Sequence, residues 1–236
     1  SQGFPDAGIY ILRDDHLPMT VNAGPNGQNG RGGHAHNHKL GITLQIGADE
    51  WMIDPGTFVY TANYESRDIF RSTHAHNTIQ VDGLEQIEFT QHNPFTLMPD
   101  APTIVHRWVN SDQYDLLDVS HAGYMRLEES VSHRRQIYLH KDTTSYCLIY
   151  DILTGEGHHT LDLLFQVGDV SVNISSQNNL TLIQGNSRLG LFINSSQPIG
   201  VRLEENWRAI SYGHKTKSNM IRYRQDTNLP TYFLTI

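Results

Sequence analysis

The residues of this chain best suited to chemistry form a histidine row, in which His34, His36 and His38 are separated by single residues. In an extended strand alternate side chains share a face, so this spacing predicts that the three imidazoles project in the same direction. Imidazole is the commonest metal-ligating side chain, and its ordinary pKa near neutrality lets it gain or lose a proton. One such row can therefore supply metal ligands together with a general acid or base.

Two motifs downstream strengthen the case for a metal site. Asp54 places a carboxylate at the end of the apolar run 51–53, and residues 74–77 repeat the His-Ala-His-Asn pattern of residues 34–37. The alternative is a solvated, histidine-rich loop without metal, because a short His-rich tract is only a compositional signal. Together the motifs favour a site built from imidazole and carboxylate ligands.

Length and charge narrow the class of protein. The 236 residues are enough for one large all-β domain, and we expect a single domain over residues 1–236. The formal net charge of -8 argues against nucleic-acid binding. No segment approaches the roughly 18 consecutive apolar residues of a membrane span, so none is expected. The start of the chain has neither a methionine nor a signal pattern, which predicts a processed or excised fragment.

Alternating apolar and polar residues predict strands along most of the chain. Asp82-Gly83 predicts a tight hairpin turn, and the strands beyond it follow one another at the spacing of a long antiparallel meander. Residues 58–70 are expected to form an ordered loop with one helical turn. So many strands imply an all-β fold, a large two-sheet antiparallel β-sandwich with very little helix. The predicted strands are residues 7–13, 17–22, 41–46, 51–54, 78–81, 104–108, 114–120, 132–139, 145–153, 160–167, 180–183, 189–193, 200–204, 208–212, 220–223 and 232–236.

Four motifs resemble those of the heparinase II/III-like domain, the C-terminal β-sandwich of polysaccharide lyases that act on heparin, heparan and alginate. Order and spacing both match over residues 4–10, 33–37, 51–57 and 70–83. The resemblance implies a lyase of bacterial type that cleaves an acidic, uronic-acid-containing polysaccharide by β-elimination. It also favours a periplasmic or secreted location.

The resemblance implies a role for each residue of the motifs. His36, Asp54 and His76 match positions that hold zinc in relatives, and His34 matches one implicated in catalysis. Two imidazoles and a carboxylate are an acceptable zinc set, so zinc is expected in preference to calcium or another divalent ion. Relatives usually carry Asp where this chain has His38, which is therefore a possible extra ligand.

Other residues near the motifs are candidates for binding the acidic polysaccharide. Arg67 and Arg71 flank Phe70, and an arginine can bind a carboxylate through two hydrogen bonds. A surface role for these two arginines is an equal alternative to substrate binding. The predicted substrate-binding residues are Arg31, Tyr60, Arg71 and Asn77.

The resemblance also implies a missing partner. In the family an N-terminal α/α toroid supplies a tyrosine and most other catalytic groups, and this sequence has no comparable helical pattern. We therefore expect the isolated chain to be inactive without its toroid.

Two other classes of protein compete with a lyase domain. A non-catalytic carbohydrate-binding sandwich would bind glycans through Trp51, Tyr60 and Tyr64 without cutting them. A cupin metalloenzyme also contains His-x-His in a β fold. That motif requires a glutamate four or five residues after the second histidine, where this chain has Leu40 and Gly41.

Overall fold

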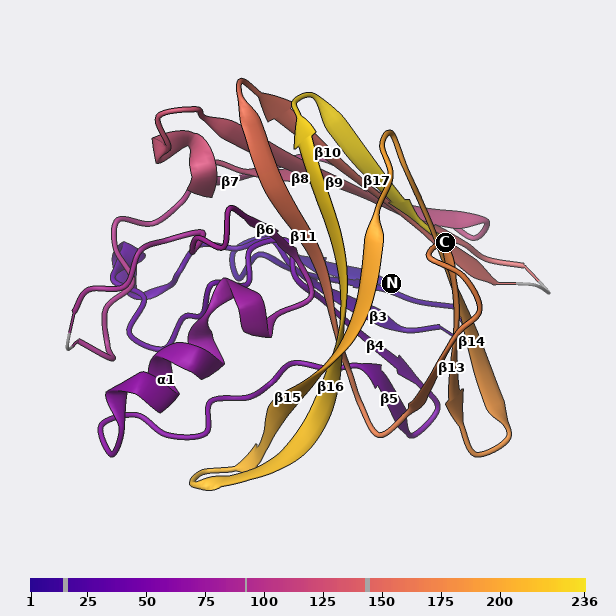
Figure 1. Cartoon of the computed structure of the whole chain (residues 1–236), viewed down its shortest axis with the longest axis horizontal. Coiled ribbons are helices and arrows are strands. Elements are labelled where there is room, and N and C mark those ends of the chain that lie inside the picture. Colours follow the sequence, from indigo (N-terminus) through magenta and orange to yellow (C-terminus); the bar gives the residue numbers. More distant parts are fainter. Residues whose placement is uncertain (15–16, 92, 143–144) are drawn as a thin grey trace.

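The computed structural model describes residues 1–14, 17–91, 93–142 and 145–236, whose strands form two antiparallel sheets packed face to face (Figure 1). The larger sheet has the order β1-β2-β3-β4-β5-β11-β16-β15, with β6 beside β11, and the smaller has the order β12-β13-β14-β17-β10-β9-β8-β7. The predicted two-sheet sandwich is confirmed.

The strands of the larger sheet are β1 (Gln2–Phe4), β2 (Ile9–Leu12), β3 (Met19–Asn22), β4 (Ile42–Ile46), β5 (Asp49–Met52), β6 (Ile79–Val81), β11 (His158–Val167), β15 (Gly200–Ser211) and β16 (His214–Asn228). Those of the smaller sheet are β7 (Thr103–Asn110), β8 (Tyr114–His121), β9 (Val131–His140), β10 (Tyr146–Gly155), β12 (Ser171–Ile174), β13 (Asn179–Gln184), β14 (Ser187–Ser195) and β17 (Thr231–Thr235). Single turns of 3-10 helix are η1 (Gln28–Gly30), η2 (Thr73–Ala75) and η3 (Gly123–Arg126).

Strand β9 shows how the core is built. Its burial alternates strictly, so that every second side chain enters the space between the sheets. Ile137 and Leu139 pack there with apolar side chains of both sheets. His133 and Arg135 occupy inward positions of the same strand and are fully buried. The core therefore contains charged and polar groups that need specific partners.

The predicted meander is correct for β7 to β10 but wrong for the next strand. β10 pairs with β9 and β17, whereas β11 pairs with β16, β6 and β5 in the other sheet. The reason lies in the burial of β11, which is buried at nearly every position from His159 to Val167. A strand covered on both faces belongs at the centre of a sheet, so the chain crosses between the sheets after Gly155.

The segment predicted as a loop with one helical turn contains helix α1 (Tyr64–Arg71), the only α-helix among the described residues. Its N-cap Asn63 accepts a hydrogen bond from the backbone N–H of Ser66 at 2.8 Å. The buried side chains Arg67, Phe70 and Arg71 follow helical i, i+3, i+4 spacing and form one face. Within the described residues, no helix is long and apolar enough to cross a membrane.

The turn at Asp82-Gly83 forms as predicted, since both residues have positive φ, 53° and 68°, as a type I′ turn requires. The second strand of the expected hairpin does not form. Beyond the turn, the only isolated bridge among the described residues joins Leu84 to Val81. The backbone N–H of Ile87 is instead bonded to Asn37 Oδ1 at 3.0 Å. These residues thus tie the turn to the loops that carry the histidines.

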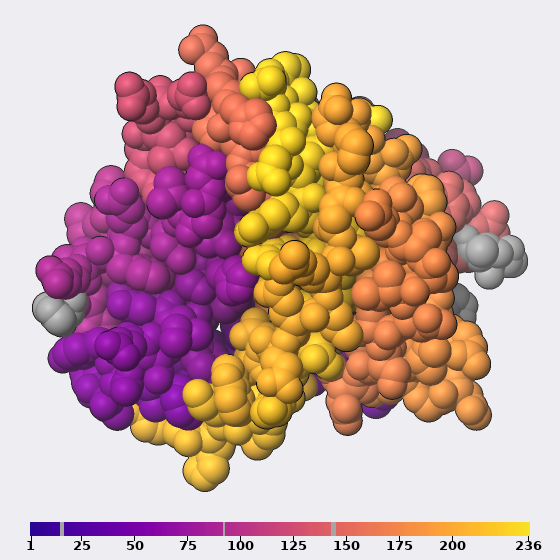
Figure 2. Space-filling model, viewed as in Figure 1, coloured from indigo at the N-terminus to yellow at the C-terminus, as the bar shows by residue number. Residues whose placement is uncertain are grey.

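Residues 33–41 are irregular, so the extended strand predicted for the histidine row is wrong. This loop and the segments around α1 lie beside the larger sheet, on the side away from β13 and β14 (Figure 1). In the space-filling view, the purple surface of this region meets the yellow and orange surface of β15 and β16 (Figure 2).

Candidate metal centre

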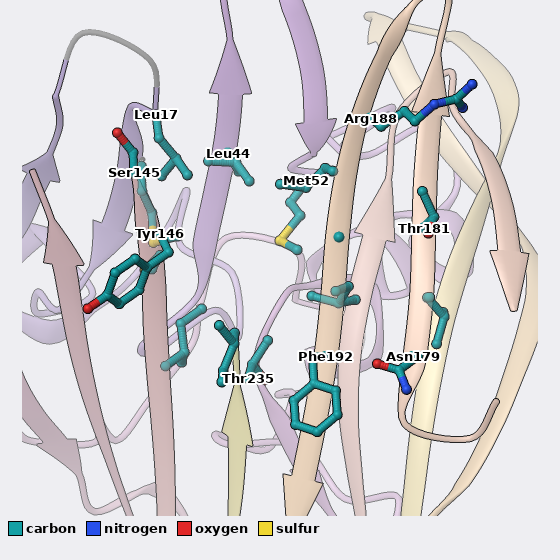
Figure 3. Close-up of a pocket in the computed structure, with 18 of the residues that line it drawn as sticks. Leu17, Leu44, Met52, Ser145, Tyr146, Asn179, Thr181, Arg188, Phe192 and Thr235 are labelled. Atoms are coloured by element: carbon teal, nitrogen blue, oxygen red, sulfur yellow. The ribbon is translucent and has the colours of Figure 1, made fainter. Parts of the chain in front are cut away.

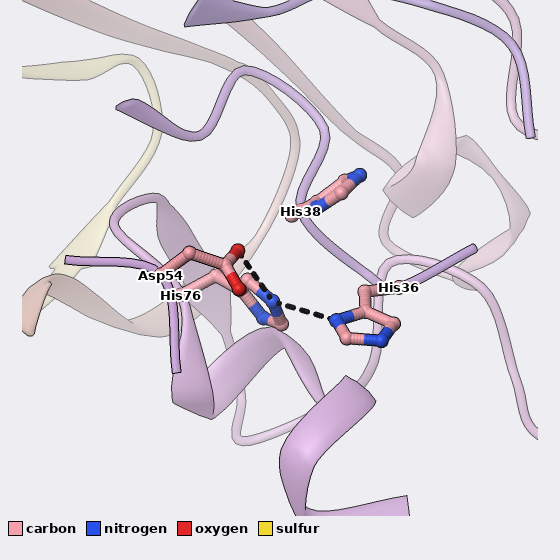
Figure 4. A group of neighbouring side chains, drawn as sticks. All are labelled: His36, His38, Asp54 and His76. Carbon is pink, nitrogen blue, oxygen red and sulfur yellow. Dashed lines mark hydrogen bonds and ion pairs between the residues drawn. The ribbon is translucent and has the colours of Figure 1, made fainter. Parts of the chain in front are cut away.

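Four side chains with metal-ligating atoms converge beside the larger sheet, and their nearest ligand atoms all lie within 4.8 Å of one another (Figure 4). His36 and His38 come from the loop before β4, Asp54 follows β5, and His76 follows η2. The structure therefore brings together the three predicted ligands and the possible fourth, His38.

Two distances within the cluster fit a tetrahedral ion. His36 Nδ1 lies 3.2 Å from His76 Nε2, and Asp54 Oδ2 lies 3.5 Å from the same nitrogen. Ligand atoms about 2.0–2.2 Å from a zinc ion in tetrahedral geometry are about 3.3–3.6 Å apart. The donor types and these two separations thus fit zinc.

Hydrogen bonds orient the ligands. His76 Nδ1 donates to the carbonyl of Ser72 at 2.6 Å, so Nε2 is unprotonated and is the nitrogen that could bind a metal. Asp54 Oδ1 accepts from the backbone N–H of Gly56 at 2.8 Å, and Oδ2 is directed at His76. Asn22 contacts His38 Nε2 at 2.8 Å. Ligand orientation is therefore set by the surrounding polypeptide.

Arg67 is a buried cation directly beside the cluster. Its Nη1 donates to His36 Nε2 at 2.7 Å, so His36 carries its proton on Nδ1 and must lose it to bind a metal through that atom. Its Nε and Nη2 have no hydrogen-bond partner among the described residues, and the guanidinium carbon lies 4.9 Å from the centre of the Tyr60 ring. Burial lowers the pKa of Arg67 to about 10, which still leaves it charged at neutral pH.

His34 is separate from the cluster, so the prediction that all three histidines of the row face the same way is wrong. Because residues 33–38 are not extended, His34 is exposed, and its Nδ1 lies 3.2 Å from Tyr60 Oη. Together with Arg31 it lines an open hollow of about 430 Å³ whose other lining residues are Gln28, Asn29, Gly33 and Phe95.

Tyr60 connects this hollow to the cluster. Its ring stacks on Phe95 at 5.4 Å and on Tyr212 at 6.3 Å between centroids, and it also contacts the guanidinium of Arg67. The aromatic stack thus joins three distant parts of the sequence. Tyr60 therefore contacts both His34 and Arg67.

Arg71 and Asn77 lie elsewhere, in the interior. The Arg71 guanidinium donates to Asp68 and to the backbone carbonyls of residues 93, 94 and 96, and it is fully buried. Asn77 donates to the carbonyls of Ile42 and Ile53 and accepts from the N–H of Gln166. Neither side chain lines the hollow beside His34. Arg71 binds the backbone on both sides of Phe95, and Asn77 joins the segments that begin β4 and follow β5.

A hollow larger than the one beside His34 lies away from the cluster. A mostly apolar cleft of about 700 Å³ opens between the sheets, and its lining includes Leu44, Met52, Thr181 and Phe192 (Figure 3). None of its described lining residues is a ligand of the cluster. Size alone therefore does not locate the chemistry of this protein.

Comparison with known proteins identifies the family. The family described as "Heparinase II/III-like, C-terminal" matches residues 1–232. The chain belongs to the heparinase II/III-like family. The cupin alternative is therefore wrong. In a sequence comparison no curated protein matches the chain.

Solved structures share the fold of this heparinase II/III-like domain. A heparinase III, the BT4657 gene product, has a TM-score of 0.82 and 20% identity over 99% of this chain and 35% of its own. The heparan sulfate lyase HepC from Pedobacter heparinus has a TM-score of 0.77 and 20% identity over 98% and 34%. A further heparinase III has a TM-score of 0.77 and 13% identity. The chain thus spans about a third of the length of these structures.

Two members of the aromatic stack were not predicted from the sequence. Phe95 and Tyr212 lie far from the histidine motifs, and nothing local distinguishes them. For Arg67 the sequence did contain a signal of burial, because the spacing of Arg67, Phe70 and Arg71 places all three on one helical face. The surface alternative for Arg67 and Arg71 is wrong, since both are fully buried. Trp51 is buried in the core and is not available to stack on a sugar.

Burial favours the neutral form of four histidines of the heparinase II/III-like domain. Desolvation, followed by the neighbouring His76, lowers the pKa of His36 well below its ordinary value and that of His38 to about 4. A neutral imidazole has a free lone pair, as metal binding requires. Burial also lowers the pKa values of His121 and His133 in the core.

We expect these buried histidines to make the metal-free domain sensitive to acid. Their pKa values in the folded state are below the unfolded value of about 6.5, so their contribution to the free energy of unfolding is complete above that pH and is lost as the pH falls. For His38 the folded pKa is about 4. The free energy of unfolding, measured by urea denaturation, should decrease as the pH is lowered from about 6.5.

The variant His121→Phe provides the control, because it removes one of the titrating groups. Its free energy of unfolding should depend less on pH, by about 1.4 kcal/mol per pH unit between pH 6.5 and the folded pKa. Identical slopes for the variant and the wild type would contradict this origin of acid sensitivity.

Proposed function

We propose that this domain is the C-terminal part of a polysaccharide lyase that cleaves an acidic, uronic-acid-containing polysaccharide by β-elimination. The observation that carries the proposal is the exposed imidazole of His34, bonded to Tyr60 at an open hollow and connected through Arg67 to a partly buried ligand cluster. Membership of the heparinase II/III-like family supports the same class of reaction.

The chemistry of β-elimination matches the groups at this hollow. The C5 proton next to the uronate carboxylate is removed, enolate-like charge develops on that carboxylate, and the glycosidic oxygen leaves with a proton. With His34 Nδ1 engaged by Tyr60, Nε2 is the nitrogen available to transfer a proton. Arg31, exposed in the same hollow, is suited to bind a carboxylate.

The metal we propose is zinc, held by His36, Asp54 and His76 with His38 as a fourth ligand. Three imidazoles and one carboxylate suit zinc, whereas calcium and magnesium prefer oxygen ligands. When bound, zinc would supply positive charge and hold the loops together near His34. Arg71 and Asn77 are assigned positioning roles, because their polar atoms bind the backbone of these loops.

The remaining catalytic groups are proposed to come from an α/α toroid. Elimination requires a base, a charge stabiliser and an acid held together, and correct positioning accounts for about 7–11 kcal/mol of the barrier in favourable cases. His34 and its neighbours supply only some of these groups. The solved relatives are about three times as long as the region that matches this chain, which leaves room for such a domain.

The test is an assay of the full-length protein that contains this domain against a panel of acidic polysaccharides. Cleavage creates a C4–C5 double bond conjugated to the uronate carboxylate, and the rise in ultraviolet absorbance measures it. We expect product from the full-length protein and none from residues 1–236 alone. Strong cleavage by the isolated chain would contradict the proposed division of labour.

A non-catalytic carbohydrate-binding role is the second candidate. It is favoured by the stack of Tyr60, Phe95 and Tyr212, since aromatic faces are suited to contact with sugar rings and Tyr212 is 61% exposed. Retention of acidic polysaccharides by the full-length protein, without any unsaturated product, would favour this role over a lyase.

A further inference from the structure

A buried chain of charged and polar groups crosses the core from the smaller sheet to the metal centre. Arg135 of β9 and Asp151 of β10 are both fully buried. We propose that Arg135, held in place by Asp151, is a positioning residue that clamps together the two loops carrying the metal-ligating histidines. Its effect on metal binding rests on the proposed zinc site, whereas the clamp itself does not.

The contacts of Arg135 are directional. Its Nε and Nη2 donate to the two carboxylate oxygens of Asp151 at 2.6 and 2.9 Å, a bidentate pair that sets the plane of the guanidinium. The remaining Nη1 donates to the carbonyl of Leu40 at 2.7 Å and to that of Asn77 at 3.0 Å. One nitrogen thus joins two segments 37 positions apart in the sequence.

The two carbonyls belong to the ligand loops. Leu40 follows His38 by two residues, and Asn77 directly follows His76. Leu40 has a φ of 58°, a left-handed conformation that is unfavourable for a residue other than glycine unless its surroundings hold it there. The hydrogen bond to its carbonyl is one of the contacts that stabilise this geometry.

Asp151 is in turn oriented by two histidines. His133 Nε2 donates to Asp151 Oδ1 at 2.7 Å, and His121 Nε2 donates to His133 Nδ1 at 3.2 Å. The backbone N–H of Gly123 donates to His121 Nδ1 at 3.0 Å, which requires the His121 proton to be on Nε2. Burial alone would raise the pKa of Asp151, but Arg135 and His133 outweigh burial and bring it to about 2. Asp151 is therefore charged at neutral pH.

A contribution to stability does not by itself account for this pair. Burial of two charges costs desolvation energy, and well-packed apolar replacements of such pairs are often neutral or stabilising. Beyond Asp151, the hydrogen bonds that Arg135 donates within the described residues run to the ligand loops. The arrangement instead resembles the outer contacts that orient metal ligands, whose loss typically weakens metal binding 10–100-fold.

The test is the double variant Arg135→Met/Asp151→Leu. It replaces both charged side chains, so that neither charge is left unpaired. Two properties are measured: the dissociation constant for zinc by competition with a chromophoric chelator, and amide hydrogen exchange of residues 36–42 and 74–79 in metal-free protein. We expect a folded protein whose zinc affinity is weakened about 10–100-fold and whose two loops exchange faster than in the wild type.

The matched control is Arg134→Met/Asp118→Leu. Arg134 is the neighbour of Arg135 on β9, and it forms a two-point ion pair with Asp118 on the opposite face of the sheet, away from the ligand loops. Zinc affinity and loop exchange should remain at wild-type values in this control.

Each outcome decides the proposal. A folded Arg135→Met/Asp151→Leu protein with wild-type zinc affinity and loop exchange would overturn it. If that protein does not fold, Arg135→Lys takes its place, since lysine keeps the charge but cannot span Asp151 and both carbonyls. Unchanged loop exchange in Arg135→Lys would equally overturn the clamp. If the wild type binds no zinc, the proposed metal site fails, and loop exchange alone decides the clamp.

Discussion

Replacing His76 with alanine is expected to remove zinc from the domain, whereas the purified wild type carries close to one zinc ion per chain. His76 Nε2 lies at the centre of the cluster, near His36 Nδ1 and Asp54 Oδ2, so its loss separates the remaining ligands. At a free zinc concentration of 1,000 times the dissociation constant, bound metal stabilises the folded state by about 4.1 kcal/mol. Elemental analysis and thermal denaturation with and without zinc would measure both effects.

The repeated motif provides a matched control for His76→Ala. His74 belongs to the same His-Ala-His-Asn sequence but contacts Gln80 Oε1 and lies outside the cluster. The variant His74→Ala should therefore keep its zinc. His38→Ala should keep zinc at lower affinity, because three ligands remain. Stoichiometric metal in His76→Ala, or none in wild type prepared without chelators, would contradict the proposed site.

Replacing His34 with alanine in the full-length enzyme is expected to lower turnover by about 10² or more, the usual scale for loss of a proton-transfer group. Zinc content should be unchanged, since His34 lies outside the ligand cluster. Steady-state kinetics on the cleaved polysaccharide, combined with elemental analysis, would separate the two roles. Wild-type turnover in His34→Ala would refute the proposed role.

Tyr60→Phe tests the partner of His34. It removes the hydroxyl 3.2 Å from His34 Nδ1 and keeps the ring that stacks on Phe95. We expect a smaller loss of turnover than in His34→Ala, with KM close to that of the wild type. A large rise in KM with normal turnover would instead assign Tyr60 to substrate binding.

Strand content and the residues of the candidate metal cluster were predictable from the sequence. Burial of one sheet face produces an alternation with period two, which is visible wherever the backbone is extended, as in β9. The three predicted ligands lie in short local motifs. Asp54 and the histidines flank short strands that pair within the larger sheet, so their approach follows from neighbouring strand ends.

Predictions failed where the backbone is irregular or where the partners are distant. Period two does not apply to residues 33–41, so only the folded loop decides that His38 joins the cluster and His34 turns to Tyr60. The place of β11 depends on burial of both its faces, which its own sequence does not assign to a particular sheet.

By itself, the sequence determined the class of fold, the ligand types and the family, because these depend on local alternation and short motifs. Only the tertiary structure decided the surroundings of the site. Tyr212 reaches Tyr60 from β15–β16, and Arg135 reaches the histidine loops from the opposite sheet. Such contacts depend on how two sheets and several loops pack, and no short-range pattern encodes that packing.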